Sequence, residues 1–198
     1  MNLKIIEEIN GNLTESIKGW EKIKSLNELK EIENIEEVYF SALEAKRIFS
    51  QLNTVIHATG ILLYSRGILL KNEIIESMSL GAGNTNKGFD LVTDKRIAEF
   101  KFIEWKGRDS IRQNSVFCDF YKLLKFKTSK KKELYINDKE TVLKFLNGKR
   151  AIESLLSKNR ELEKLFTEEY EKKYIEVGKF YRDYKDQVSI IELNCIQK

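Results

Sequence analysis

The stretch GFDLVTDKRIAEFKFIEW, residues 88–105, contains the pattern that decides the fold. Its second part, residues 97–105, predicts a β-strand, in which alternate side chains point to opposite faces. One face carries Ala98, Phe100 and Phe102, and the other carries Ile97, Glu99, Lys101, Ile103 and Trp105. Both faces are mainly apolar, which is typical of an interior strand that is covered on both sides.

Glu99 and Lys101 are the charged residues on the second of these faces. Burial of a carboxylate and an ammonium group is costly unless the two groups pair or bind a metal. Residues 89–92 predict a short strand, and the tight connection at 93–96 brings Asp90 within reach of Glu99 across the strand pair. A structural ion cluster or a strand exposed on one face is the alternative to a functional site.

Two carboxylates that converge on one point repel each other unless a cation lies between them. Mg²⁺ prefers oxygen ligands of this kind and keeps several of its waters. Asp90 and Glu99 therefore predict a site for Mg²⁺ or Mn²⁺, where such a cation polarises a phosphate oxygen and activates water. Lys101 would stabilise the developing negative charge or help to position the water. Together the three residue types favour hydrolysis of phosphodiester bonds.

The rest of the chain predicts an α/β domain with a mixed sheet. A long helix covers about residues 38–63, with Gly60 and Gly67 marking its end. After the three-stranded meander, Asp109 or Ser110 caps a helix that runs to about Phe126. The other expected elements are strands at 74–80, 133–136 and 188–193, a turn-rich loop at 81–88, and a mostly helical segment at 139–185. This order is helices, three strands, helix, strand, helices, strand.

Composition limits the class of protein. The chain has 198 residues, 41% of them hydrophobic, which suits one domain with a real core. Two cysteines and one histidine exclude zinc sites built from several Cys and His ligands. The net charge of +4 permits a polyanionic partner. Residues 1–10 lack the features of a signal peptide, and no stretch is long and apolar enough to cross a bilayer, so we expect a soluble, cytoplasmic protein without a membrane partner.

The runs Gly88–Val92 and Ala98–Phe102 resemble the core motif of the PD-(D/E)XK nuclease superfamily. In that family a helix precedes a β-meander with Asp on the second strand and Glu-x-Lys on the third, and a helix and a strand follow. The resemblance covers about residues 40–136. It implies a restriction-endonuclease-like three-layer core at residues 38–136, with a mixed central sheet between helices. Residues 1–37 and 137–198 would be helical extensions, the second ending in a strand.

The same resemblance implies a metal-dependent nuclease with Mg²⁺ or Mn²⁺ as cofactor, acting on DNA rather than RNA. Asp90 and Glu99 match the metal ligands of the family, and Lys101 matches its lysine. Gln113, on the following helix, matches a glutamine that some exonuclease-like branches carry, and would orient the metal ligands or touch the substrate. The family often adds a glutamate from its first helix, for which Glu44 is the candidate and Glu76, on the first strand, the competing one.

Several further features have two readings. His57 is either a half-buried residue of an apolar helix or a group that faces the site. Residues 81–88 form a plain turn or, less in keeping with their sequence, a phosphate cradle. Residues 161–185 predict a packed helix, or a helix that binds a partner or forms a homodimer. A basic run beside the site either contacts phosphates or is simply solvated; its members are Arg108, Arg112, Lys122, Lys125, Lys127, Lys130, Lys131 and Lys132.

Two functions compete with the nuclease. The first is a catalytically inactive module on the same fold that binds nucleic acid. The second is a protein-interaction domain, such as an inhibitor or regulator. Metal binding between Asp90 and Glu99 separates the nuclease from both alternatives.

Overall fold

The structure, a computed structural model, describes residues 52–81, 88–102, 105, 109–171 and 173–193, together with Leu43, Lys46, Arg47, Phe49 and Ser50. The chain divides into two units, residues 1–50 and 51–198. The five described residues of the first unit are helical. The second unit contains the sheet and the candidate site. No helix among the described residues is long and apolar enough to cross a membrane.

The second unit is built on a sheet of five described strands in the order β1-β2-β3-β4-β5. Their bounds are β1 Ile75–Met78, β2 Leu91–Thr93, β3 Arg96–Lys101, β4 Lys131–Ile136 and β5 Ser189–Glu192. The first three strands form an antiparallel meander, and β3, β4 and β5 are parallel. The predicted mixed sheet is therefore confirmed.

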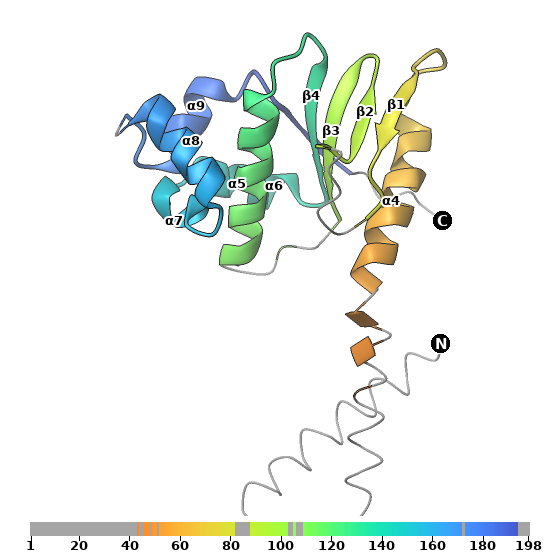
Figure 1. The fold of residues 1–198 in the computed structure, drawn as a ribbon, viewed down its shortest axis with the longest axis horizontal. Helices are drawn as coiled ribbons and strands as arrows, with labels where there is room; N and C mark the ends of the chain where they lie inside the picture. Colours follow the sequence, from red (N-terminus) through yellow and green to blue (C-terminus); the bar gives the residue numbers. More distant parts are fainter. Residues whose placement is uncertain are drawn as a thin grey trace, which may run out of the picture. The chain divides into compact units, whose positions relative to one another are not determined.

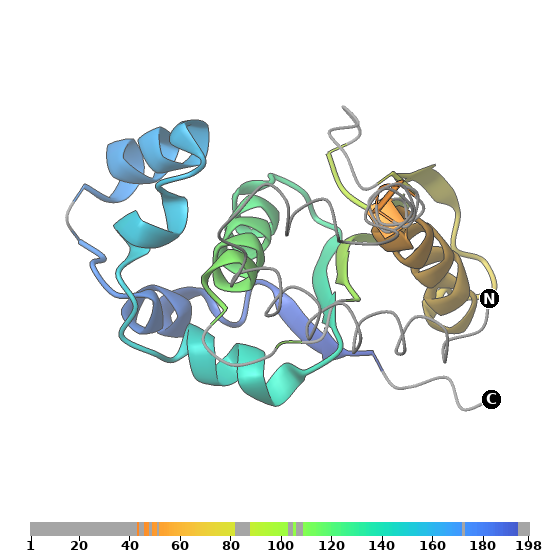
Figure 2. The same ribbon diagram turned by 90° about the horizontal axis from the view of Figure 1, so that it is seen from below.

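Helices cover both faces of this sheet (Figures 1 and 2). Their bounds are α4 Leu52–Ile68, α5 Ser110–Lys125, α6 Lys139–Leu146, α7 Ile152–Leu156, α8 Arg160–Tyr170 and α9 Val177–Tyr184. Helix α4 lies on one face, where Ile61 packs with Leu91, Ala98, Phe100, Tyr135 and Leu193. The other helices lie on the opposite face, where Ile97, Leu134 and Ile136 meet the aromatic residues of α5, α8 and α9. The alternation of residues 97–100 between the faces agrees with the sequence pattern.

The long helix runs past Gly60 and ends one residue after Gly67, so only the second of the two predicted glycines marks its end. Gly60 lies inside α4, which ends at Ile68 rather than near residue 63. A Cβ atom at Gly60 would lie 2.6 Å from the ring of Phe102, so this glycine is where β3's extension packs against the helix. Gly60 therefore serves a close approach between two layers and does not terminate the helix.

The predicted helix at 161–185 is two helices, α8 and α9. Glu171, at the end of α8, has a φ of 48°, a left-handed conformation that interrupts an α-helix. Further along, the Ile175 carbonyl accepts the Ile152 N–H, and the Val177 N–H donates to the Arg150 carbonyl. These bonds tie the connection between α8 and α9 to the start of α7. The chain therefore turns between the two helices, although its apolar residues keep a helical spacing throughout 161–185.

A buried network of charged residues links the segment just before β1 to β3 and β4. The Arg96 guanidinium donates to both carboxylate oxygens of Glu73, from Nε at 2.6 Å and Nη2 at 2.9 Å. Its Nη1 donates to Glu133 at 2.9 Å, and the Thr93 hydroxyl donates to Glu73 at 2.7 Å. Although burial works against it, these hydrogen bonds lower the pKa of Glu73 from 4.5 to about 2.

Glu73→Gln should therefore reduce stability at neutral pH and flatten its acid dependence. The lowered pKa means that the Glu73 charge stabilises the fold fully above pH 4.5, and that this stability is lost as the pH falls through about 2. The shift corresponds to roughly 3 kcal/mol. Urea unfolding at several pH values between 2 and 7 measures it, with the exposed Glu168→Gln as control. An acid dependence in Glu73→Gln equal to that of the wild type would refute the assignment.

Candidate active site

Asp90 lies immediately before β2, at the point where β2 and β3 stop pairing. Leu91, the first residue of β2, lies opposite Ala98, and the regular pairing of β2 with β3 ends at this pair. Beyond it, the backbone N–H of Phe100 donates to Asp90 Oδ2 at 2.8 Å, so a side chain takes the place of the next ladder bond. Because strand N–H groups point along the sheet toward the neighbouring strand, this bond holds the carboxylate between the two helical layers.

The other oxygen of Asp90 meets helix α4. His57 Nε2 lies 3.1 Å from Asp90 Oδ1. The imidazole packs edge-on against Phe102, with ring centroids 5.8 Å apart, and Phe102 in turn fills the space beside Gly60. His57 thus faces the site, which the sequence left open.

Glu99, on β3, is buried next to Asp90 and is hydrogen-bonded to it. Burial and the charges of Asp119 and Asp90 raise the pKa of Glu99 well above its usual range. Burial also acts on Asp90, but hydrogen bonds with His57, Glu99 and the Phe100 N–H hold its pKa below the ordinary value. Of the two neighbouring carboxyl groups, Glu99 is therefore the one that binds a proton more readily, and Asp90 is the one that stays ionised.

Lys101 pairs with a residue that sequence reasoning missed. Its Nζ lies 2.5 Å from Asp119 Oδ2 on α5. Burial opposes the charge of Lys101, yet Asp119 outweighs this effect and raises the pKa of the ammonium group. Asp119 is the one acidic residue of α5 and lies among buried apolar neighbours such as Phe117 and Phe120. A single acidic residue among the apolar residues of a helix is the sequence feature that could have identified Asp119 as a site residue.

The result is a row of ionisable groups that crosses all three layers: His57 of α4, then Asp90, Glu99 and Lys101 of the sheet, then Asp119 of α5. We call these five residues the cross-layer cluster. All of them lie at the carboxyl end of β3 or face it. The structure therefore brings together the three residues that the sequence selected and adds one from each flanking layer.

The cross-layer cluster suits only certain cations. Among the described residues, no group of three or more His, Cys, Asp or Glu side chains could hold a metal ion. A closed site of four protein ligands is thus not formed by this part of the chain. Two adjacent carboxylates do fit Mg²⁺ or Mn²⁺, which accept one or two protein carboxylates and keep their waters.

The other predicted site residues lie elsewhere or outside the described residues. The Gln113 side-chain oxygen accepts a hydrogen bond from Arg150 Nη1 at 2.6 Å. Glu76, on the edge strand β1, is exposed and accepts from Lys130 Nζ at 2.6 Å. The structure brings neither of them to the cross-layer cluster. Glu44 and Arg108 fall outside the described residues, as does most of the loop at 81–88.

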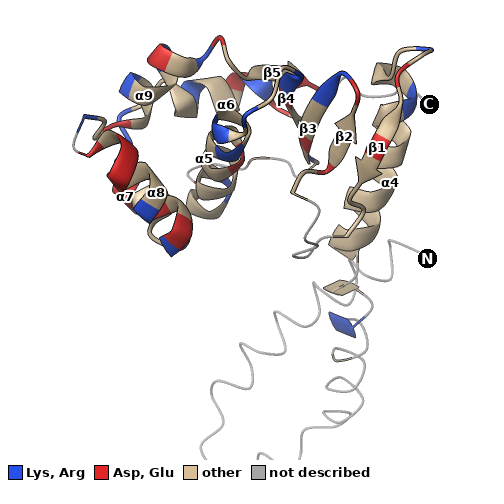
Figure 3. Cartoon of the chain, turned by 45° about the horizontal axis from the view of Figure 1, so that its top comes forward, with Lys and Arg blue, Asp and Glu red and all other residues tan. Residues whose placement is uncertain are grey.

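The lysines of the basic run between Lys125 and Lys132 are not beside the cluster. In the parallel pairing of β3 and β4, Lys131 lies opposite Arg96. Arg96 is five residues before Lys101, so Lys131 is about 16 Å from the cluster along the strand direction. Figure 3 shows this concentration of Lys and Arg at the end of the sheet where β4 begins. Three members pair with acidic residues: Lys125 with Glu169, Lys130 with Glu76, and Arg112 with Asp109. Lys122 is exposed on α5.

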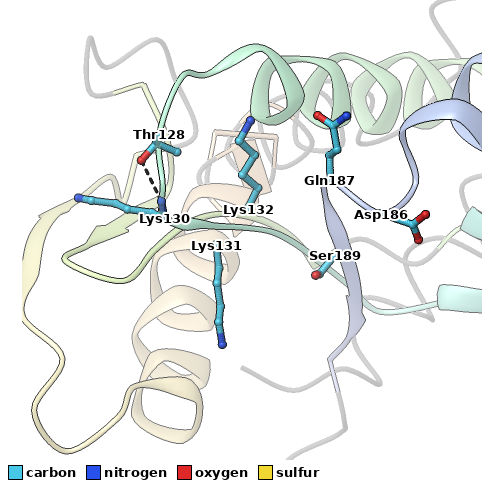
Figure 4. Close-up of a pocket in the computed structure, with 7 residues that line it drawn as sticks. All are labelled: Thr128, Lys130, Lys131, Lys132, Asp186, Gln187 and Ser189. Atoms are coloured by element: carbon cyan, nitrogen blue, oxygen red, sulfur yellow. Dashed lines mark hydrogen bonds between the residues drawn. The ribbon is translucent and has the colours of Figure 1, made fainter.

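A pocket lies at this basic end, lined by Thr128, Lys130, Lys131, Lys132, Asp186, Gln187 and Ser189. The side chains of its three lysines point in different directions (Figure 4). Lys132 donates to the Leu124 carbonyl at 2.7 Å. The residues that line the pocket are polar, but its three lysine side chains do not point toward one place where an anion could bind.

Comparison of the chain with protein-family models, with curated proteins and with solved structures finds no match.

Proposed function

We propose that the chain is a Mg²⁺- or Mn²⁺-dependent nuclease that hydrolyses phosphodiester bonds through the cross-layer cluster. The observation that carries the proposal is the meeting of Asp90, Glu99 and Lys101 at the carboxyl end of β3, where the Phe100 N–H and His57 hold Asp90 and the Asp119 carboxylate holds Lys101. The preference for DNA over RNA rests on the resemblance of residues 88–102 to the PD-(D/E)XK motif.

Asp90 and Glu99 are the groups that would hold the cation. When bound, a divalent cation at this place supplies Lewis-acid activation of phosphate and of water. Each oxygen of Asp90 has two lone pairs, and the bonds to His57 and the Phe100 N–H leave capacity on both. Glu99 has to give up its proton for both carboxylates to act as ligands.

Lys101 acts electrostatically in this proposal. Its ion pair with Asp119 keeps the ammonium charged and fixes it next to Glu99. A fixed positive charge in a largely buried place stabilises negative charge that develops on a phosphoryl group, and it needs no rearrangement at the moment of reaction. An ammonium group held in this way has no free lone pair, so it does not take a proton from water.

Cleavage of labelled DNA and RNA by the purified protein, in Mg²⁺, Mn²⁺ or EDTA, tests the proposal. We expect wild-type cleavage that requires the cation, and none above background in Glu99→Gln, which keeps the shape of the side chain but removes the carboxylate. Glu153→Gln, an exposed change on α7, is the matched control. Equal background cleavage by the wild type and Glu99→Gln on every substrate would exclude the nuclease.

A second candidate function is an inactive nuclease-fold module that binds nucleic acid or a protein partner. The observation that favours it is the absence, among described residues, of three converging metal-ligating side chains. It predicts that Mn²⁺ binds the wild type and Glu99→Ala alike, and that any nucleic-acid affinity follows the basic end of the sheet and falls with salt.

A further inference from the structure

We infer that His57 is a positioning residue for the Asp90 carboxylate, an inference that rests on the proposed metal-dependent function. The hydrogen bond from imidazole Nε2 to Asp90 Oδ1 would fix the orientation in which Asp90 meets a cation. His57 is the only histidine of the chain. It reaches the site from α4, a layer that contributes no other member of the cross-layer cluster.

The geometry argues for a partner of Asp90 rather than for a third ligand. His57 Nε2 is directed at Asp90 at 3.1 Å, and no group of three ligating side chains that could hold a metal occurs among the described residues. The His57 side chain is 21% exposed, whereas that of Asp90 is 12% exposed. A donor in this place satisfies one oxygen of a nearly buried carboxylate and leaves the second lone pair of that oxygen available.

The surroundings of His57 hold its ring in one position. Phe102 contacts the imidazole edge-on and stacks on Tyr64, which lies about two turns after His57 on α4. The close approach of Phe102 at Gly60 seats this aromatic residue between His57 and Tyr64. The Phe100 N–H fixes the other oxygen of Asp90 from the sheet. The carboxylate is thus held from two layers at once, which is the arrangement that hydrogen-bond partners of metal ligands provide.

Two substitutions separate hydrogen bonding from shape. His57→Gln keeps an N–H donor at about the same distance from the backbone as Nε2, whereas His57→Leu fills similar space without a donor. We expect His57→Leu to weaken Mn²⁺ binding by about 10- to 100-fold and His57→Gln to stay within a few-fold of the wild type. Calorimetric titration of the purified full chain with Mn²⁺ measures both, and Thr59→Ala on the exposed side of α4 is the control.

Thermal unfolding without metal shows whether each variant is folded before the titration. Mn²⁺ binding by His57→Leu equal to that of the wild type would overturn the positioning role. Equal weakening in His57→Leu and His57→Gln would overturn it as well, because the donor would then not be the relevant feature. If the wild type itself binds no Mn²⁺, both the proposed function and this role fail. Failure of the role alone leaves wild-type binding intact, so the two results are distinguishable.

Discussion

Lys101→Ala should lower the rate of metal-dependent cleavage by about 100- to 1,000-fold, the usual loss when a fixed electrostatic group is removed from an active site. The ammonium group lies next to Glu99 and is held by Asp119 at 2.5 Å. In the proposed function the charge of Lys101 acts on the phosphoryl group and not on the cation, so Mn²⁺ affinity should change much less than turnover. The measurement is single-turnover cleavage at saturating Mg²⁺, with the exposed Lys158→Ala as the control for loss of a lysine.

The same substitution also leaves Asp119 buried without its partner, which costs several kcal/mol in such pairs. The double variant Lys101→Gln with Asp119→Asn removes both charges and replaces the ion pair with two amides. We expect it to unfold at a higher temperature than Lys101→Ala and yet to lose the same 100- to 1,000-fold in rate. A double variant that is stable and cleaves at the wild-type rate would exclude Lys101 as the electrostatic group.

Gly178→Ala should be the most destabilising alanine substitution among the described glycines Gly60, Gly67, Gly88, Gly148 and Gly178. A Cβ atom at Gly178 would lie 2.6 Å from the Gly148 carbonyl oxygen and 2.7 Å from that of Asn147. Both are backbone atoms, and the Gly178 N–H donates to the same Gly148 oxygen at 2.9 Å. The added methyl group must therefore displace α9, which carries the buried Phe180 into the aromatic core.

We expect a loss of about 3 kcal/mol or more in the free energy of unfolding for Gly178→Ala, because overpacking against rigid backbone is not relieved by a side-chain rotation. Gly67→Ala is the matched control: it lies in α4 with nothing within 4 Å of the added Cβ. That change should be neutral or stabilising by up to about 1 kcal/mol. Urea unfolding of the two variants gives the comparison. Similar stabilities would show that α9 does not pack on the 147–148 turn.

The order of elements in the second unit was predictable because its signals are local. Alternation in residues 97–101 set which side chains face α4 and which face α5, and the described faces agree with it. Asp109 was one of two expected caps for α5, and it accepts from the backbone N–H groups of Ile111 and Arg112. Each of these features depends on a few neighbouring residues, which a single sequence displays.

Helix ends were less predictable where tertiary packing decides them. Gly60 and Gly67 both predict a helix end, but only Gly67 lies near the end of α4 at Ile68; Gly60 lies within the helix, where Phe102 occupies the space of a missing Cβ. Residues 161–185 keep one apolar spacing across two helices, because the connection between them is set by hydrogen bonds to Arg150 and Ile152. Phe102, Arg150 and Ile152 are distant in the sequence from the helix ends that they affect, so a local pattern does not reveal these contacts.

The site was predictable only within the sheet. Asp90, Glu99 and Lys101 were found because a short connection places Asp90, just before β2, beside Glu99 and Lys101 of the adjacent strand β3. His57 and Asp119 come from helices 33 residues before Asp90 and 18 residues after Lys101, and only the packing of three layers brings them together. The lysines between Lys125 and Lys132 lie away from the site for the same reason, because they stand at the end of α5 and the start of β4, at the opposite end of the parallel strand pair from Lys101.

The most direct test of the cation site is calorimetric titration of the wild type, Asp90→Asn and Glu99→Gln with Mn²⁺. If Asp90 and Glu99 hold the cation, the wild type binds one Mn²⁺ ion, and each variant binds it at least about 100-fold more weakly while remaining folded. Wild-type binding that survives both substitutions, or no binding by the wild type, would contradict a metal site at the carboxyl end of β3.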